Sequence, residues 1–162
     1  MLVVAAGGIV DGRGLAMALS LGAAGVWVGT RFVAAKEAGA PARHQAAVVA
    51  AGYHDTRRTI IYTGRPLRVL YSPYVRNWEE TRQAEIKDLT RKGKIPVYAD
   101  MEARVAAGEE IDIKTRLGAQ PLLMGQAAGA VTTVQPAKEI IDDMMSGAVR
   151  CLRDANGLIS KL

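Results

Sequence analysis

The chain has 162 residues, of which 49% are hydrophobic and 23% charged, and its formal net charge is +5. This is the composition of a globular domain, and no apolar run reaches the ~18–20 residues that span a bilayer, so we expect no membrane segment. One cysteine, Cys151, excludes an internal disulfide, and His44 and His54 are too few to form a zinc cluster. We therefore predict a cytoplasmic protein without a metal site.

Residues 2–28 predict a β–α–β unit. Residues 2–6 and 25–28 are short apolar runs, which are typical of strands buried in a parallel sheet. Between them, Asp11 is suited to cap the start of a helix and Gly22 to end it. The whole unit takes about 25 residues, which is the short length expected when one helix joins two parallel strands.

The rest of the chain is predicted to be mainly helical. We expect helices over residues 33–51 in two pieces, 78–91, 101–107, 121–130 and 137–154, and β-like runs over 58–62 and 66–70. The helix over 78–91 is predicted to be amphipathic and exposed. The last helix carries an apolar stripe that we interpret as core, formed by Ile140, Ile141, Met144, Met145, Val149 and Leu152.

Both predicted strands end in a sequence suited to holding a phosphate group. The first ends in Gly7-Gly8 and the second in Gly29-Thr30. Glycine lets backbone N–H groups approach an anion closely, and a helix that follows adds unpaired N–H groups. In (β/α)8 barrels the loops after strands 7 and 8 commonly bind phosphate. The alternative, that these glycines only form tight turns, leaves the second loop as a coincidence.

These residues carry a resemblance to a known family. The chain resembles the FMN-dependent nitronate monooxygenases, formerly called 2-nitropropane dioxygenases, and is most similar to the fungal members. The resemblance covers nearly the whole chain and is weakest over 93–120. Its motifs are Val4-Ala5-Ala6-Gly7-Gly8-Ile9-Val10-Asp11-Gly12-Arg13-Gly14, Leu21-Gly22-Ala23, Val28-Gly29-Thr30-Arg31-Phe32, Thr63-Gly64-Arg65-Pro66-Leu67-Arg68 and Met124-Gly125-Gln126-Ala127-Ala128-Gly129.

The resemblance implies an α/β fold, the carboxy-terminal part of a (β/α)8 TIM barrel. Residues 1–52 would supply barrel strands 7 and 8 with their phosphate loops, and residues 53–162 a carboxy-terminal helical extension, together one partial domain. A whole barrel needs about 200 residues or more, so strands 1–6 are expected to be absent. Met1 would be either a true start in a truncated gene or an artefact of gene prediction. An open pair of strands leaves unpaired edges, so we expect the chain to be marginally stable, to aggregate or to pair with a complementary half.

The resemblance also implies a reaction and its site. The family uses FMN and O2 to oxidise a nitronate to a carbonyl compound and nitrite. Matching positions would bind FMN, and these are Ala6, Gly7, Gly8, Gly29 and Thr30, with Gly125 and Gln126 near the flavin. No catalytic residue is assigned, because the family's catalytic histidine belongs to the missing amino-terminal part. The chain alone is therefore expected to be inactive or weak.

Two other functions stay open. One is a related FMN barrel oxidoreductase, of the enoyl reductase or NAD(P)H:quinone reductase type. The other is a non-catalytic truncated product that binds a phosphate-bearing ligand or a partner chain. The arginines are interpreted as solvated or near an anionic cofactor rather than as a nucleic-acid surface, and the densest run comprises Arg57, Arg58, Arg65 and Arg68. The sequence leaves the oligomeric state open.

Overall fold

A computed structural model describes residues 1–159 of the chain. These residues divide into two compact units, each described here by itself. Within the described residues, unit 1 comprises Met1–His54 together with residues 124–159, and unit 2 comprises Asp55–Leu123. Segments from both ends of the sequence therefore build the first unit.

Unit 1 is built on a parallel strand pair, β1 (Val4–Ala6) and β2 (Gly25–Trp27), joined by α1 (Gly12–Ser20). The predicted β–α–β unit is thus present, with Ala5 opposite Val26 and Ala6 opposite Trp27. Asp11 caps α1 by accepting hydrogen bonds from the backbone N–H groups of Arg13 and Gly14. Gly22, with a φ of +88°, provides the left-handed turn after the helix ends.

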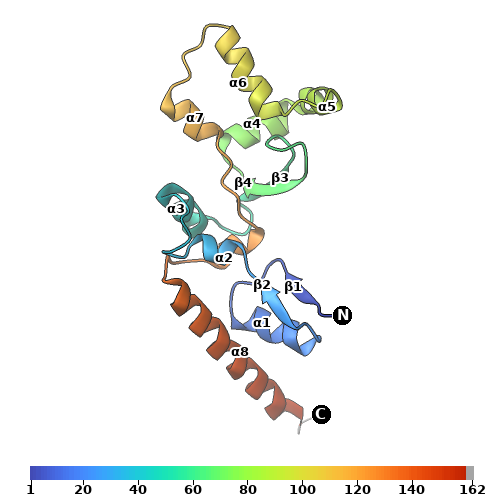
Figure 1. The fold of residues 1–162 in the computed structure, drawn as a ribbon, viewed down its shortest axis with the longest axis vertical. Coiled ribbons are helices and arrows are strands. Elements are labelled where there is room, and N and C mark those ends of the chain that lie inside the picture. The colour runs from blue at the N-terminus through green and yellow to red at the C-terminus, as the bar shows by residue number, and fades with distance from the viewer. Residues whose placement is uncertain (160–162) are drawn as a thin grey trace. The chain divides into compact units, whose positions relative to one another are not determined.

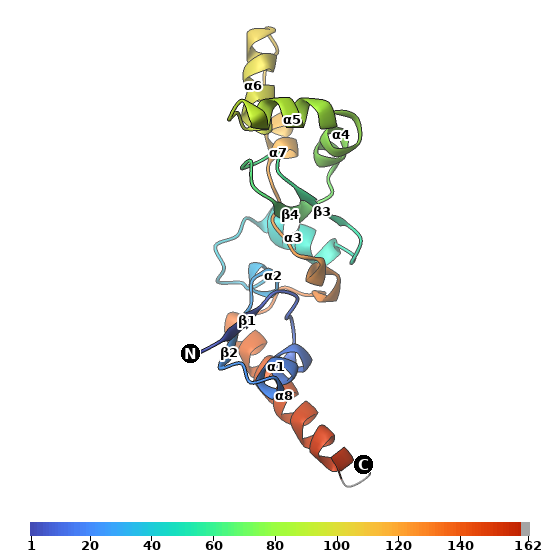
Figure 2. The same ribbon diagram turned by 90° about the vertical axis from the view of Figure 1, so that its right-hand side faces the viewer.

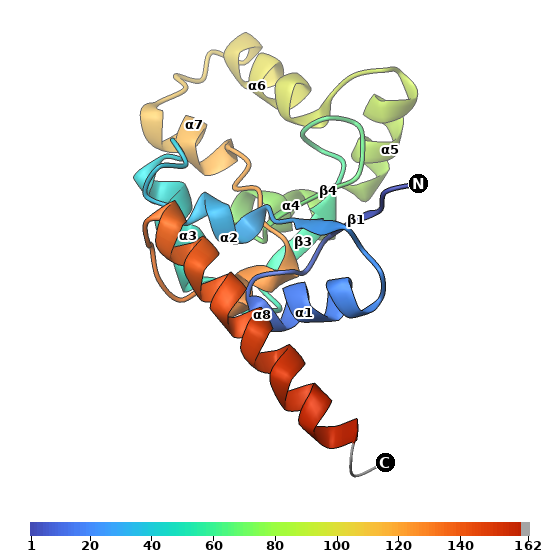
Figure 3. The same cartoon turned by 60° about the horizontal axis from the view of Figure 1, so that its bottom comes forward.

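Four further helical segments belong to the described part of unit 1. They are α2 (Thr30–Val33), α3 (Ala42–Ala50), the 3₁₀ helix η1 (Gln126–Ala130) and α8 (Ala137–Ile159). Figures 1 and 3 show α8 lying alongside α1, with its last turns extending past it. The two helices approach so closely that a Cβ added to Gly12 would come within 2.4 Å of the Ala148 backbone nitrogen.

The strand pair is buried on only one face, which corrects the prediction of two buried strands. Ala5 and Val26 face the core and pack against Ile9, Ile140 and Met144. On the other face, Trp27 is 74% exposed and Val4 is 56% exposed. The cause is that successive side chains of a strand alternate between faces, and the described helices of unit 1 cover one face alone.

Unit 2 holds an antiparallel hairpin, β3 (Thr56–Thr59) and β4 (Leu67–Leu70), with four helices. Figure 2 shows the helices α4, α5, α6 and α7 grouped on the same side of this hairpin. Their bounds are α4 (Pro73–Thr81), α5 (Gln83–Arg91), α6 (Pro96–Ala106) and α7 (Ile113–Ala119). The core between them contains Ile61, Val69, Val75 and Trp78, all nearly or fully inaccessible to solvent.

Several predicted helices were wrong in detail. The single exposed helix over 78–91 is two helices, and Trp78 is fully buried because it packs into the core of unit 2. The helix over 121–130 is reduced to η1. In the apolar stripe of α8, Ile140 and Met144 are buried, whereas half or nearly half of the surface is exposed for Ile141, Met145, Val149 and Leu152. α7 was not predicted at all.

Candidate phosphate-binding site

The two glycine loops predicted to hold phosphate meet at one cavity of unit 1. The cavity has a volume of about 250 Å³. Gly7-Gly8 follows β1 and Gly29-Thr30 follows β2, and parallel strands bring their carboxyl ends to the same edge. Gly125, which precedes η1, and Ala127, which lies within it, close the third side. The lining comprises Ala6, Gly7, Gly8, Ile9, Trp27, Gly29, Thr30, Gly125 and Ala127.

Gly7 and Gly8 adopt a backbone conformation that favours glycine. Their φ angles are +96° and +73°, which residues with a Cβ rarely adopt. A Cβ added at either position would meet nothing within 4 Å, so the requirement comes from the turn and not from crowding. The same open space leaves the loop backbone accessible to a ligand.

Backbone donors are available at both loops. Within residues 1–159, the N–H groups of Gly8 and Gly29 donate to no other backbone group. The start of α1 is not available in this way, because the Asp11 carboxylate already accepts from Arg13 and Gly14. The hydrogen bond from the Arg13 side chain to Asp11, together with these N–H bonds, outweighs the opposing effect of burial and lowers the pKa of Asp11. An anion in the cavity would therefore be met by loop amides and not by the end of α1.

Thr30 connects the loop after β2 to the segment before η1. Its hydroxyl oxygen accepts a hydrogen bond from the Gly125 backbone N–H at 2.9 Å. The hydroxyl hydrogen is then free to be donated to a ligand oxygen. A Cβ on Gly125 would lie 3.4 Å from the Thr30 Oγ1 atom, at the edge of ordinary van der Waals contact.

The structure brings together all but one of the seven predicted binding residues. Gln126 is exposed, begins η1 and does not line the cavity. Three lining residues were not predicted, namely Ile9, Trp27 and Ala127. Trp27 lies two residues before Gly29, and the period-two alternation of strand side chains is the signal that places both on one face.

Arg31, which directly follows Thr30, points away from this cavity. It is 8% exposed and donates hydrogen bonds to the Thr133 carbonyl oxygen at 3.2 Å and to the Gln135 side chain. Burial lowers the pKa of Arg31, and the Asp143 charge opposes that effect. Arg31 instead lines a separate cavity of about 200 Å³ with Asp143. In the described part of unit 1, no lysine or arginine lines the phosphate cavity.

The histidines and the cysteine also lie elsewhere. His44 belongs to α3, His54 is an exposed residue at the end of the first segment of unit 1, and Cys151 is a half-buried residue of α8. None of them lines the cavity. Across residues 1–159, no cluster of three histidine, cysteine or acidic side chains could hold a metal ion. Over the same residues, no helix is long and apolar enough to cross a bilayer.

The chain matches one family model and is similar to several known proteins. A family model described as nitronate monooxygenase matches residues 2–147. A nitronate monooxygenase of Metarhizium robertsii is 58% identical over 62 residues, covering 37% of this chain and 17% of that protein. A (3aS,4S,5R,7aS)-5-hydroxy-7a-methyl-1-oxo-octahydro-1H-indene-4-carboxyl-CoA dehydrogenase of Mycobacterium tuberculosis is 31% identical over 185 residues, covering 97% of this chain and 52% of that protein.

A similar solved structure supports the mixed α/β architecture. FabK of Thermotoga maritima aligns with a TM-score of 0.72 at 30% identity, covering 97% of this chain and 47% of that chain. The chain spans about half the length of the curated relatives that it matches from end to end.

Proposed function

Because the chain belongs to the nitronate monooxygenase family, we propose that it takes part in the FMN-dependent oxidation of nitronates and that it binds the phosphate end of FMN. The observation that carries this proposal is the meeting of Gly7-Gly8, Gly29-Thr30 and Gly125 at one cavity. Their loops offer unpaired backbone N–H groups and one hydroxyl, which is the donor set that a phosphate dianion requires.

The residues present fit an FMN phosphate. Gly7 and Gly8 have the left-handed conformation and leave open space on the side where a Cβ would lie. The phosphate oxygens would accept hydrogen bonds from the Gly8 and Gly29 N–H groups and from the Thr30 hydroxyl. Gly125 would hold Thr30 in place for that contact, and Trp27 would provide an apolar wall beside it. Gln126 is not part of this proposal.

We further propose that β1 and β2 are strands 7 and 8 of a (β/α)8 barrel, with α8 covering their outer side and residues 55–123 forming an addition to it. The one-sided burial of the pair supports this, since parallel sheets are normally covered on both faces. Val4 and Trp27 would then face the barrel interior, where side chains from neighbouring strands would pack on them.

When bound, FMN supplies the electron acceptor for the nitronate, whose oxidation with O2 yields a carbonyl compound and nitrite. The share of residues 1–159 in this reaction is to hold and orient the phosphate. We assign them no catalytic residue, because no described histidine, aspartate or glutamate lines the cavity. The reaction of the chain by itself is accordingly expected to be slow.

The choice of reductant tests the proposed reaction. The FMN-loaded protein is mixed anaerobically with an alkyl nitronate or with NADPH, and flavin bleaching is followed against free FMN. Faster bleaching by the nitronate, followed by nitrite release when oxygen is admitted, is the expected result. Bleaching by NADPH that is as fast as or faster than bleaching by the nitronate would contradict the proposed reaction.

One observation favours a second candidate, a related oxidoreductase that does not use nitronates. The relative from Mycobacterium tuberculosis that aligns along 97% of this chain is named as a carboxyl-CoA dehydrogenase. Bleaching by NADPH but not by the nitronate would favour this second function. Both candidates use the same phosphate site, so the FMN-binding tests below apply to either.

A further inference from the structure

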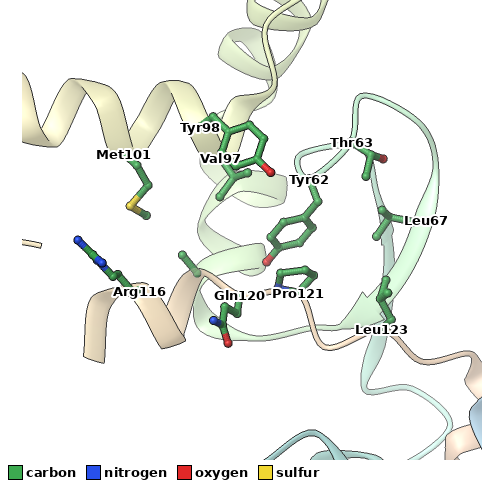
Figure 4. Close-up of a pocket in the computed structure, with 11 residues that line it drawn as sticks. Tyr62, Thr63, Leu67, Val97, Tyr98, Met101, Arg116, Gln120, Pro121 and Leu123 are labelled. Carbon is green, nitrogen blue, oxygen red and sulfur yellow. The ribbon is translucent and has the colours of Figure 1, made fainter. Parts of the chain in front are cut away.

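Unit 2 contains a cavity that the proposed function does not use. It has a volume of about 480 Å³, and Figure 4 shows its lining residues. The cavity lies between the turn that follows β3, the helix α6 and the end of α7. A volume in this range is typical of sites that hold small organic molecules.

The walls of the cavity are fixed by backbone contacts. The Val97 N–H, at the start of α6, donates to the Ile61 carbonyl oxygen at 3.1 Å. On the other side, the Leu70 N–H donates to the Leu122 carbonyl oxygen at 2.9 Å, and Val69 pairs with Leu123 as an isolated β-bridge. The cavity is therefore held open by the fold and does not depend on a side-chain rearrangement.

Most of the lining is apolar. Leu67, Val97, Met101 and Ala119 contribute aliphatic surface, and the Tyr62 ring lies among them in Figure 4. Burial raises the pKa of Tyr62 to about 12, so the phenol is neutral at ordinary pH. Its hydroxyl is enclosed and has no hydrogen-bond partner in the described chain. These walls suit a hydrocarbon group, because burying it releases water from apolar surface on both sides.

Among the described residues, one cationic side chain lines the cavity. Arg116 on α7 extends toward Met101 across the cavity in Figure 4. Two other arginines of unit 2, Arg82 and Arg104, are both bonded to the Asp100 carboxylate. Arg116 forms no ion pair within residues 1–159. An unpaired guanidinium beside an apolar wall is complementary to a molecule that has a hydrocarbon body and an anionic end.

We propose that this cavity binds an aliphatic carboxylate, with the hydrocarbon chain against Tyr62, Val97 and Met101 and the carboxylate on Arg116. Arginine is suited to this role, because its planar fork donates two parallel hydrogen bonds to one carboxylate. The proposal rests on unit 2 alone and is independent of the FMN site in unit 1.

Calorimetric titration of the 162-residue chain with decanoate and with decylamine tests the proposal. The two probes have the same hydrocarbon chain and opposite charge. Decanoate is expected to bind with one site per chain and roughly tenfold or more tightly than decylamine, because a hydrogen bond to a charged group is worth about that factor. Absence of decanoate binding, or equal affinity for the two probes, would overturn the proposal.

Variants of two lining residues, Arg116 and Met101, test whether decanoate binds in this cavity. Arg116→Gln is expected to weaken decanoate binding roughly tenfold, and Arg116→Lys to restore part of it. Arg58→Gln is the matched control, because Arg58 is an exposed arginine of the same unit that does not line the cavity. Met101→Trp should fill the cavity and abolish binding. Unchanged affinity in Arg116→Gln, or an equal loss in Arg58→Gln, would contradict the assignment, and the charge variants decide it even if Met101→Trp fails to fold.

Discussion

The Thr30 hydroxyl accepts a hydrogen bond from the Gly125 N–H at 2.9 Å, although the two residues lie 95 positions apart in the sequence. This bond joins the loop after β2 to the segment that precedes η1, and both line the proposed phosphate cavity. It makes Thr30 the polar side chain on which the geometry of the site depends.

Replacing Thr30 by valine is therefore expected to weaken FMN binding roughly tenfold. Valine has nearly the same shape but no hydroxyl, so the Gly125 N–H loses its acceptor and the phosphate loses a donor, which costs about 1–2 kcal/mol. Quenching of flavin fluorescence measures the affinity. Thr30→Ser, which keeps the hydroxyl, should retain most of it. An equal loss in both variants would show that packing of the methyl group, and not the hydroxyl, matters.

Gly12 lies at the closest approach of α1 to α8. A Cβ at this position would come within 2.6 Å of backbone atoms of Gly147 and Ala148, which no side-chain rotation can relieve. Gly12→Ala is expected to lower the free energy of unfolding by about 2–3 kcal/mol, because the helices must separate. Gly25→Ala is the matched control, since a Cβ there meets nothing within 4 Å and its φ is ordinary. Denaturant unfolding of both variants compares them, and similar stabilities would refute the close helix contact.

Tyr62 and Tyr74 lie in the same region of unit 2 but use their hydroxyls differently. The Tyr62 hydroxyl is buried without a partner, whereas the Tyr74 hydroxyl donates to the Asp100 carboxylate at 3.0 Å. We expect Tyr62→Phe to be neutral or to stabilise by up to about 1 kcal/mol, and Tyr74→Phe to destabilise by about 1–2 kcal/mol. Thermal unfolding reports the sign of each change. Destabilisation of the same size in both would contradict the described hydrogen bonding.

Asp100 makes the stability of unit 2 dependent on acid. Burial alone would raise the pKa of Asp100, but hydrogen bonds from Arg82 and Tyr74 and the charges of Arg82 and Arg104 lower it below its ordinary value of 3.8. A lowered folded-state pKa means that Asp100 stabilises the fold fully above the unfolded value. This contribution is lost as the pH falls below 3.8 toward the folded-state pKa.

Asp100→Asn should therefore destabilise the protein at neutral pH by about 1–2 kcal/mol, because Arg82 and Tyr74 lose a charged acceptor. Arg82 keeps its ion pair with Glu85. The variant should also unfold with less dependence on pH in the acid range. Urea unfolding at neutral and acid pH measures both effects. Asp88→Asn is the control on an exposed carboxylate, and we expect it to have little effect. A pH dependence unchanged in Asp100→Asn would place the acid-sensitive group elsewhere.

The sequence predicted most residues that line the cavity of unit 1, whereas parts of the fold were not predicted. Gly7-Gly8 and Gly29-Thr30 were predictable because glycine pairs at the ends of two apolar runs are local signals, and parallel pairing brings such ends together. The contact of Thr30 with Gly125 has no local signal, since it depends on a chain reversal of 95 positions. The prediction that the strand of Trp27 is buried was wrong for this side chain, because a three-residue apolar strand does not show which face other elements will cover.

In unit 2, the sequence did not predict where the helices break. The run over 78–91 has helical periodicity throughout, yet the helix breaks at Arg82, where the side chain bonds to Asp100 and stacks on the Trp78 ring at 3.5 Å. These contacts are tertiary, so the helical periodicity of the sequence does not predict the break. The start of α4 depends on neighbouring residues alone, because Ser72 caps the helix and Pro73 occupies its first position.

The most direct test of the central claim compares FMN with riboflavin, which lacks the phosphate. If the loops at Gly7-Gly8 and Gly29-Thr30 hold that phosphate, the 162-residue chain should bind FMN at least about tenfold more tightly than riboflavin. Gly8→Asp should abolish the difference, because it places a carboxylate beside the phosphate position. Equal affinity of the unaltered chain for FMN and riboflavin would contradict the account.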